Sequence, residues 1–296
     1  MLRCPLASLR NRLALAAGAA ALALSAPLAA SEAAAEAESA ATLPPLGLMG
    51  TIPIYWGESG GFAELLAGEA DLHWVRASLE RDYRLVPLDY LSPEALAGQK
   101  FLLLAQPRGL TADENVALDA WVRAGGHLLL FADPQMTGES RFALGDRRRP
   151  QDVALLSPIL AHWGLELRFD PAQDADWQMR EFAGTPLPTR LSGTFASAVG
   201  TSKCTLMADD LVAQCGLGSG FALILADAAL LDLADPAPES GAALATLLER
   251  AFGDQAGQGG IGRADVVASD NITENQEYDR NSGSLVNGLE SISSPP

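Results

Sequence analysis

Acidic, amide and aromatic side chains follow several apolar runs of this sequence, at positions where an α/β sheet binds ligands. The six residues are Tyr55, Trp56, Glu58, Gln106, Asp133 and Asp227. If those runs are parallel strands, their carboxyl ends meet at one edge, outside which open α/β sheets bind ligands. The rings could stack on a sugar or peptide group while the polar groups form hydrogen bonds. The sequence therefore predicts one ligand-binding pocket made of these six residues.

Two plainer roles compete with that pocket. An aspartate at the end of a strand often caps the next helix, as Asp133 before Pro134 could do. The Tyr55 and Trp56 rings could simply pack on the sheet.

The sequence lacks the residue patterns that usually mark a catalytic nucleophile or a metal site. A hydrolase of the amidotransferase type needs a Cys or Ser on the sharp turn after a strand, but residues 104–108 read LAQPR. Ser219 is flanked by glycines but precedes an apolar run instead of following one. His73, His127 and His162 do not have the spacing of metal ligands on one face. We therefore expect no catalytic residue, no metal and no cofactor.

A hydrolase of the glycosidase or amidotransferase type remains the alternative. Glu58 paired with Asp133 or Asp227 would then act as acid and base. That chemistry requires two carboxylates about 5–9.5 Å apart across a cleft, with at least one raised pKa. A purely structural envelope protein, the third hypothesis, would have no cleft at the strand ends.

Cys204 and Cys215 flank a predicted hairpin. If Asp209 and Asp210 form a two-residue turn, the two cysteines fall opposite each other, about 4.5–5.5 Å apart between Cα atoms. A disulfide tolerates that separation. We predict a structural disulfide, with a redox-active pair as the alternative.

The first thirty residues have the pattern of a secretory signal peptide. They carry three arginines, no acid, and an apolar run at residues 13–24 that ends in small residues near Ala30. We expect cleavage there and a periplasmic location in a Gram-negative bacterium, with an uncleaved inner-membrane anchor as the alternative. Cys4 precedes the apolar run, so it is not placed as a lipoprotein cysteine. Removing residues 1–30 changes the formal net charge from −17 to −20, which argues against nucleic acid as a partner.

Apolar runs and helical patterns alternate between Leu43 and Phe252. We expect strands at 46–54, 83–88, 101–105, 127–132, 165–169 and 221–226, and helices at 73–81, 111–124, 153–163 and 242–252. Thr111 is the expected N-cap of the second helix, which Gly125 ends. The pattern predicts a doubly wound, mostly parallel flavodoxin-like α/β sheet.

Segments outside the repeated units have a different composition. Residues 31–42 read as an Ala/Glu spacer, and residues 253–296 as a disordered acidic tail with few large apolar side chains. An insertion at about 175–220 has turn residues and short β-prone pieces, so we expect antiparallel hairpins there.

Two blocks of sequence resemble a known family. Residues 101–134 have a strand, then "LT-x-x-E", then "L-x-x-W-V-x-x-G-G", then an apolar strand ending in Asp-Pro, and residues 216–232 read GLGSGFALILADAALLD. Both are similar to the domain of ABC-type uncharacterised transport systems found in auxiliary subunits of gliding-motility-type ABC transporters. Glutamine-amidotransferase-like domains of class I share the strand-helix-glycine-strand pattern.

The resemblance, over about residues 43–252, implies a non-enzymatic auxiliary or ligand-binding module. Its implied partners are ABC transporter membrane subunits or other envelope proteins, and a small molecule or sugar is a further possible ligand. Auxiliary subunits of that family often carry transmembrane helices, whereas this chain has no such segment after its signal.

Overall fold

The computed structural model describes residues 43–58, 72–143, 145–198, 203–234 and 236–253. The expected signal peptide, the spacer and nearly all of the expected tail lie outside these residues. In the described part of the chain, no helix has the length and hydropathy to cross a bilayer.

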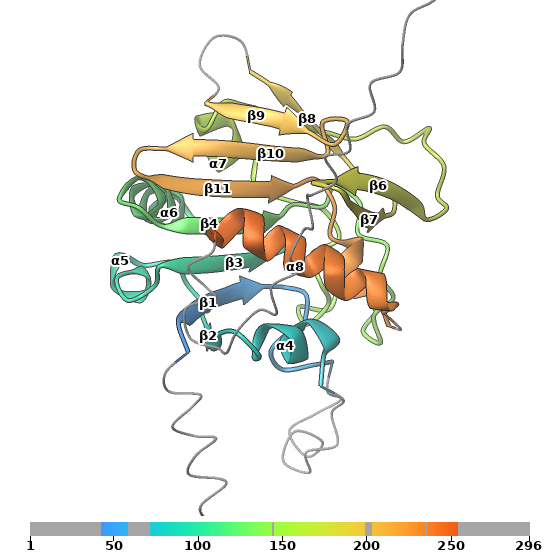
Figure 1. The fold of residues 1–296 in the computed structure, drawn as a ribbon, viewed down its shortest axis with the longest axis horizontal. Helices are drawn as coiled ribbons and strands as arrows, with labels where there is room; N and C mark the ends of the chain where they lie inside the picture. Colours follow the sequence, from blue (N-terminus) through green and yellow to red (C-terminus); the bar gives the residue numbers. More distant parts are fainter. Residues whose placement is uncertain (1–42, 59–71, 144, 199–202, 235, 254–296) are drawn as a thin grey trace, which may run out of the picture. The chain divides into compact units, whose positions relative to one another are not determined.

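One sheet of seven strands forms the centre of the fold (Figure 1). Its strands, in spatial order, are β2 (Arg84–Pro87), β1 (Pro45–Gly50), β3 (Phe101–Ala105), β4 (His127–Phe131), β11 (Gly220–Leu225), β10 (Val212–Leu217) and β9 (Cys204–Met207). The first five are parallel, and β10 and β9 extend the sheet in antiparallel pairing. The parallel strands thus have the order 2-1-3-4-5 along the chain, which doubly wound sheets of the flavodoxin type show. The predicted mostly parallel α/β class is confirmed.

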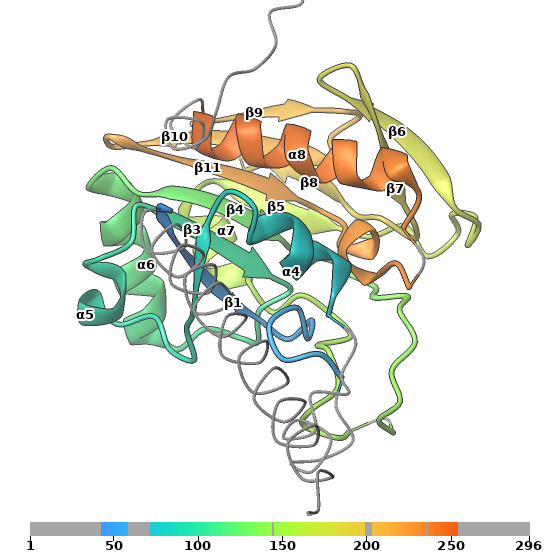
Figure 2. The ribbon, with the colours of Figure 1, turned by 60° about the horizontal axis from the view of Figure 1, so that its bottom comes forward.

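Helices cover both faces of this sheet (Figures 1 and 2). One face carries α4 (Trp74–Leu79) and α8 (Pro238–Phe252), and the other carries α6 (Ala112–Arg123) and α7 (Ser157–His162). The short helix α5 (Pro93–Leu96) packs beside α6, and a 3-10 turn, η1 (Ala229–Asp232), follows β11. Covered on both faces, β3 and β4 are almost fully buried, as their continuous apolar runs require.

Helix α6 begins as its sequence predicts. The Thr111 hydroxyl accepts a hydrogen bond from the Glu114 N–H, and the Glu114 carboxylate accepts one from the Thr111 N–H. This reciprocal capping box satisfies two N–H groups that the first turn leaves without helical partners.

Antiparallel strands occupy the expected insertion, as predicted. Strands β6 (Gln178–Phe182) and β7 (Thr185–Thr189) form a separate hairpin, while β9 and β10 join the main sheet. Asp209 and Asp210 have φ of 53° and 64° at the turn, and Cys204 lies opposite Cys215 with a Cα separation of 4.0 Å. The two cysteines form the predicted disulfide, with a Cα separation slightly shorter than expected.

Three expected elements differ from the structure. Strand β5 (Leu165–Arg168) is not part of the main sheet but pairs with β8 (Thr194–Ser197), because its outward Glu166 and Arg168 leave it only one apolar face. Helix α7 begins at Ser157 instead of Val153, since Pro158 suits a first turn and not a helix interior. The first strand ends at Gly50, and residues 51–58 form a loop.

Candidate functional site

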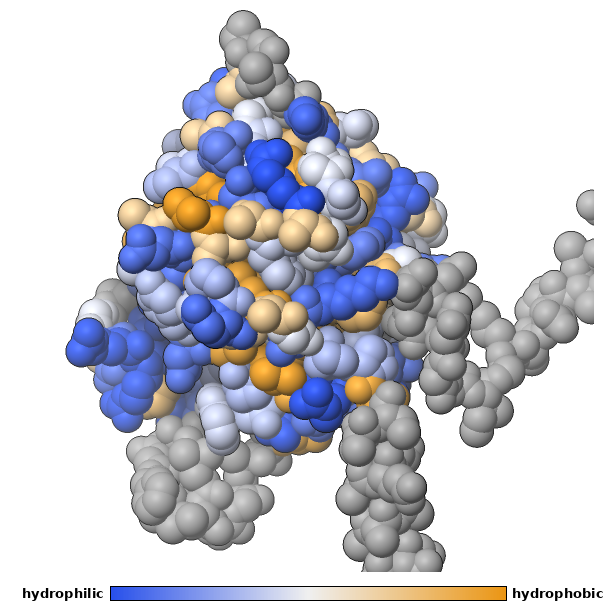
Figure 3. Space-filling model, turned by 90° about the vertical axis from the view of Figure 1, so that its left-hand side faces the viewer, coloured by the Kyte–Doolittle hydropathy of each residue, from blue (hydrophilic) through white to orange (hydrophobic). Residues whose placement is uncertain are grey.

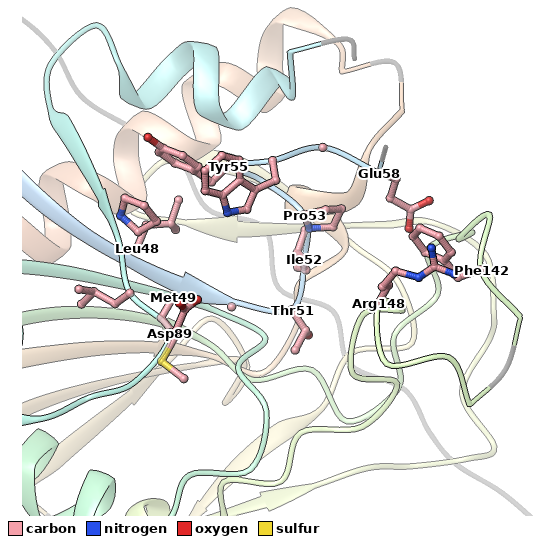
Figure 4. Close-up of a pocket in the computed structure, with 15 residues that line it drawn as sticks. Leu48, Met49, Thr51, Ile52, Pro53, Tyr55, Glu58, Asp89, Phe142 and Arg148 are labelled. Atoms are coloured by element: carbon pink, nitrogen blue, oxygen red, sulfur yellow. The ribbon is translucent and has the colours of Figure 1, made fainter. Parts of the chain in front are cut away.

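A hollow of about 320 Å³ opens where β1 and β2 end, within the usual range for ligand pockets. It is lined by Leu48, Met49, Gly50, Thr51, Ile52, Pro53, Tyr55, Trp56, Gly57, Glu58, Pro87, Leu88, Asp89, Phe142 and Arg148 (Figure 4). Figure 3 shows the side of the molecule on which the parallel strands begin, and apolar and polar residues are mixed over its surface. Because β1 and β2 end at the hollow, it lies at the carboxyl ends of parallel strands, where the sequence predicts a ligand pocket.

Close contact between β1 and β3 shapes the floor of the hollow. A Cβ on Gly50 would lie 2.1 Å from the carbonyl oxygen of Ala105, so only glycine fits there. The Thr51 N–H donates to the carbonyl oxygens of Ala105 and Gln106, at 3.2 and 3.1 Å. These contacts turn the chain away from the sheet, and residues 51–58 become the wall of the hollow.

Two aromatic rings stand on that wall. The Tyr55 and Trp56 rings meet edge to face with centroids 4.7 Å apart, and the Arg76 guanidinium lies 4.5 Å from the Tyr55 centroid. Tyr55 is half-buried against the core, whereas Trp56 is 63% exposed. An exposed indole at the mouth of a hollow is available to a ligand or a partner.

Charged groups lie at both ends of the hollow. Figure 4 shows Glu58 beside Phe142 and Arg148 on one side, and Asp89 on the other. The Glu58 carboxylate accepts a hydrogen bond from the Arg141 N–H at 3.0 Å. The Arg148 guanidinium lies 4.1 Å from the centroid of the Phe142 ring and donates to the Asp146 carboxylate at 2.7 Å. Asp89, Phe142 and Arg148 could not be predicted from the sequence, because they lie in two loops that only the fold brings to the hollow.

Gln106, Asp133 and Asp227 do not line this hollow. Gln106 has a left-handed φ of 48° and no exposed surface. Its amide donates to the carbonyl oxygens of Asp133 and Gln151 and accepts from the Asp133 N–H, at 2.8 to 2.9 Å. The side chain of Gln106 is thus bonded to the main chain. Of the six predicted residues, Tyr55, Trp56 and Glu58 line the hollow, whereas Gln106, Asp133 and Asp227 are buried elsewhere.

The two aspartates bind main-chain N–H groups of loops, and Asp133 does not cap a following helix, because the next helix begins only at Ser157. Asp133 accepts hydrogen bonds from the N–H groups of Gln135 and Ala228, and Asp227 from those of Ala229 and Arg190. Both carboxylates therefore fasten loops at the ends of β4 and β11. Burial raises the pKa of Asp133 to about 6 despite its hydrogen bonds. Burial, and then the charge of Asp133, raises the pKa of Asp227 well above its ordinary value.

Asp232 is a third carboxyl group of this region that the sequence analysis missed. Its Oδ2 is buried without a hydrogen-bond partner and packs against Gly138. Burial, followed by the charges of Glu58 and Asp133, raises the pKa of Asp232 to about 6. Its place at the end of the second family-like block was the available signal.

A carboxyl group with a raised pKa makes stability fall as pH rises. For Asp133 the stabilising contribution is complete below about pH 4 and is lost as pH rises through about 6, because the folded state holds the proton more tightly. We expect Asp133 alone to make the free energy of unfolding about 1 to 2 kcal/mol larger at pH 5 than at pH 7.5. Urea unfolding of wild type and Asp133→Asn at both pH values measures this difference in the free energy of unfolding.

The comparison with Asp133→Asn removes an opposing effect. Burial lowers the pKa of His73, so protonation of that ring below about pH 6 acts against folding in both proteins. Glu114, whose pKa is lowered to about 2, acts only at lower pH. Identical pH dependence of the two proteins would rule out a raised pKa at Asp133.

The three histidines have contacts within the protein. The His73 ring accepts a hydrogen bond from the Val75 N–H as the N-cap of α4, His127 Nδ1 lies 3.1 Å from the Ala251 carbonyl oxygen, and His162 lies 3.4 Å from Asp119. Among the residues that the structure describes, no three His, Cys, Asp or Glu side chains are grouped to hold a metal ion.

Solved structures with a related arrangement are distant. The exo-β-1,4-mannosidase from Opitutaceae bacterium strain TAV5 is 14% identical, with a TM-score of 0.39 over 74% of this chain and 36% of that chain. This chain therefore spans about a third of the mannosidase. The mmIFT52 N-terminal domain is 13% identical, with a TM-score of 0.44 over 70% of this chain and 96% of that chain. A putative ThuA-like protein from Bacteroides uniformis is 10% identical, with a TM-score of 0.38 over 71% and 91%.

A family model gives the more specific match. No curated protein matches the sequence. Residues 69–185 match the model described as "ABC-type uncharacterized transport system", which confirms the resemblance stated for the block from Phe101 to Pro134. The second block, residues 216–232, lies outside the matched segment. Residues 69–185 are thus similar to the ABC-type uncharacterized transport system family.

Proposed function

We propose that this chain is a periplasmic, non-enzymatic binding module of an ABC-type transport system. Its partners would be membrane subunits of the transporter or other envelope proteins, and its ligand a small molecule or a sugar. The family match supports the link to transport. The observation that carries a binding role is the exposed Trp56 ring beside the hollow at the ends of β1 and β2.

Two features support the periplasmic location. The Cys204–Cys215 disulfide suits an oxidising compartment. Residues 1–30 have the composition of a secretory signal.

The turn after β3 supports a non-enzymatic role. Gln106 occupies the strained position where an amidotransferase-like hydrolase carries its nucleophile, and its amide is engaged with the main chain. The alternative, a hydrolase that pairs Glu58 with Asp133 or Asp227, has the raised pKa values of the two aspartates in its favour. Against it, each aspartate accepts two main-chain hydrogen bonds, and neither lines the hollow beside Glu58.

Crosslinked envelopes of the source bacterium test this proposal. The mature protein is recovered by affinity tag, and subunits of an ABC transporter are identified by mass spectrometry. We expect them to co-purify with wild type, and their yield to fall at least fivefold with Trp56→Ala, because the exposed indole is lost from the binding edge.

Trp177→Ala is the matched control. Trp177 is also exposed, at 48%, but precedes the β6–β7 hairpin and does not line the hollow. Equal losses with the two variants would exclude the hollow as the contact site. Recovery of no transporter subunit with wild type would contradict the transport role itself.

A further inference from the structure

The aromatic groups around the hollow are already associated with cations in this chain. Arg76 lies over the Tyr55 ring at 4.5 Å, and Arg148 over the Phe142 ring at 4.1 Å. Trp56, whose indole binds cations more strongly than Tyr or Phe, exposes 63% of its surface at the same site. The hollow therefore offers an open aromatic surface of the type that ammonium and guanidinium groups recognise.

The charges that line the hollow favour a cation as well. Among the described residues that line it, Glu58 and Asp89 are acids and Arg148 is a base. Arg148 is neutralised locally, because its Nε and Nη2 donate to the two oxygens of Asp146 at 3.1 and 2.7 Å. The whole chain carries a formal net charge of −17, which attracts cations toward any such site.

The two acids of the hollow differ in their surroundings. The Glu58 carboxylate accepts a hydrogen bond from the Arg141 N–H at 3.0 Å, and the Arg141 guanidinium donates to the Glu58 carbonyl oxygen at 2.9 Å. Arg108 donates to the Asp89 carbonyl oxygen in the same way, at 2.9 Å, so the two acids differ at their carboxylates: Asp89 is exposed, whereas Glu58 is half-buried and hydrogen-bonded. The Asp89 carboxylate is therefore the stronger candidate for an incoming cation.

We propose that the hollow takes an organic cation, an aliphatic ammonium or a guanidinium group, held by the Trp56 indole and the Asp89 carboxylate. This inference rests on the proposed binding role of the same site and names its ligand chemistry. The apolar side chains of Leu48, Ile52 and Pro53 contact the aliphatic part of the ligand. A free amine and a Lys or Arg side chain of a partner protein share this chemistry.

Calorimetric titration of the purified mature protein with Nα-acetyl-arginine amide (arginine amide below) tests the proposal. Nα-acetyl-citrulline amide (citrulline amide below), in which a neutral ureido group replaces the guanidinium, is the matched ligand, since neither has a free amine and the two differ only at the group that should enter the hollow. We expect arginine amide to saturate one site and to bind at least fivefold more tightly than citrulline amide. Equal affinities would overturn the proposal.

Charge-matched variants separate the hollow from the general acidity of the chain. Asp89→Asn and Asp176→Asn each remove one negative charge from an exposed side chain, but only Asp89 lines the hollow. We expect Asp89→Asn and Trp56→Ala to lower the affinity for arginine amide at least threefold. Asp176→Asn should change that affinity less than 1.5-fold. Equal weakening by both Asp variants would show diffuse attraction and overturn the site. Thermal melts establish that each variant is folded.

Two further probes distinguish the sources of the cation. Spermidine represents a free amine, and the capped peptide acetyl-Ala-Arg-Ala-amide represents a side chain on a partner. Tighter binding of spermidine supports a small-molecule cation, and tighter binding of the peptide supports a partner chain. Loss of transporter co-purification with Trp56→Ala but no binding of any cation would overturn this inference and leave the proposed function standing.

Discussion

Replacing Glu114 with alanine is expected to lower the free energy of unfolding by about 2–4 kcal/mol, because the N–H groups of Leu91 and Thr111 lose their acceptor, whereas Arg108 is partly exposed and can be solvated. The Glu114 side chain is fully buried and accepts two hydrogen bonds from Arg108, at 2.8 Å each. It also accepts hydrogen bonds from the N–H groups of Leu91 and Thr111. Burial acts to raise the pKa of Glu114, but these hydrogen bonds outweigh it and lower the pKa to about 2.

Urea unfolding followed by circular dichroism measures the loss. Asp113→Ala is the matched control, because Asp113 is an exposed acid in the same first turn of α6. We expect that control to cost about 0.5 kcal/mol, the size of a helix-dipole contribution. A loss below about 1 kcal/mol with Glu114→Ala would mean that the hydrogen bonds of this carboxylate to Leu91, Arg108 and Thr111 do not stabilise the fold.

Reduction of the Cys204–Cys215 disulfide is expected to lower the free energy of unfolding by about 3 kcal/mol in the chain-entropy model. The bond closes a short loop, since the cysteines are 11 residues apart. It also joins β9, the edge strand of the sheet, to β10. Urea unfolding with and without a phosphine reductant measures the effect.

The Cys204→Ala, Cys215→Ala double variant is the control for that experiment. Its unfolding should not respond to the reductant, which separates loss of the bond from other effects of the reagent. An unchanged midpoint in wild type, with both thiols shown to be alkylated, would mean that the bond does not stabilise the fold.

The core of the fold was predictable because several local signals agree. For β3, α6 and β4, continuous apolar runs, the Thr111 N-cap and the Gly125 stop all indicate one βαβ unit. The pairing of Cys204 with Cys215 was predictable for a different reason. Once Asp209 and Asp210 form the turn, the register of an antiparallel hairpin follows by counting.

The candidate site was less predictable, because it is made of loops. The rule for parallel strands selects the ends of β1 and β2, where a hollow opens, and Tyr55, Trp56 and Glu58 line it. In a loop no alternation of residues decides whether a side chain points outward. Gln106 and Asp133 follow β3 and β4, as the loop that carries Tyr55 follows β1, yet they are buried and bonded to the main chain. Their burial depends on Gln151 and Ala228, which are distant in sequence.

The direction of the parallel strands also sets which way the hollow faces relative to the ends of the domain. The chain enters β1 at Pro45, and α8 ends at Phe252, whose ring centroid lies 5.0 Å from that of Phe101 at the start of β3. Both the entry and the exit are thus at the amino ends of the strands, across the sheet from the hollow. The chain therefore enters and leaves the described domain on the side opposite the exposed Trp56 ring, and neither junction obstructs the hollow.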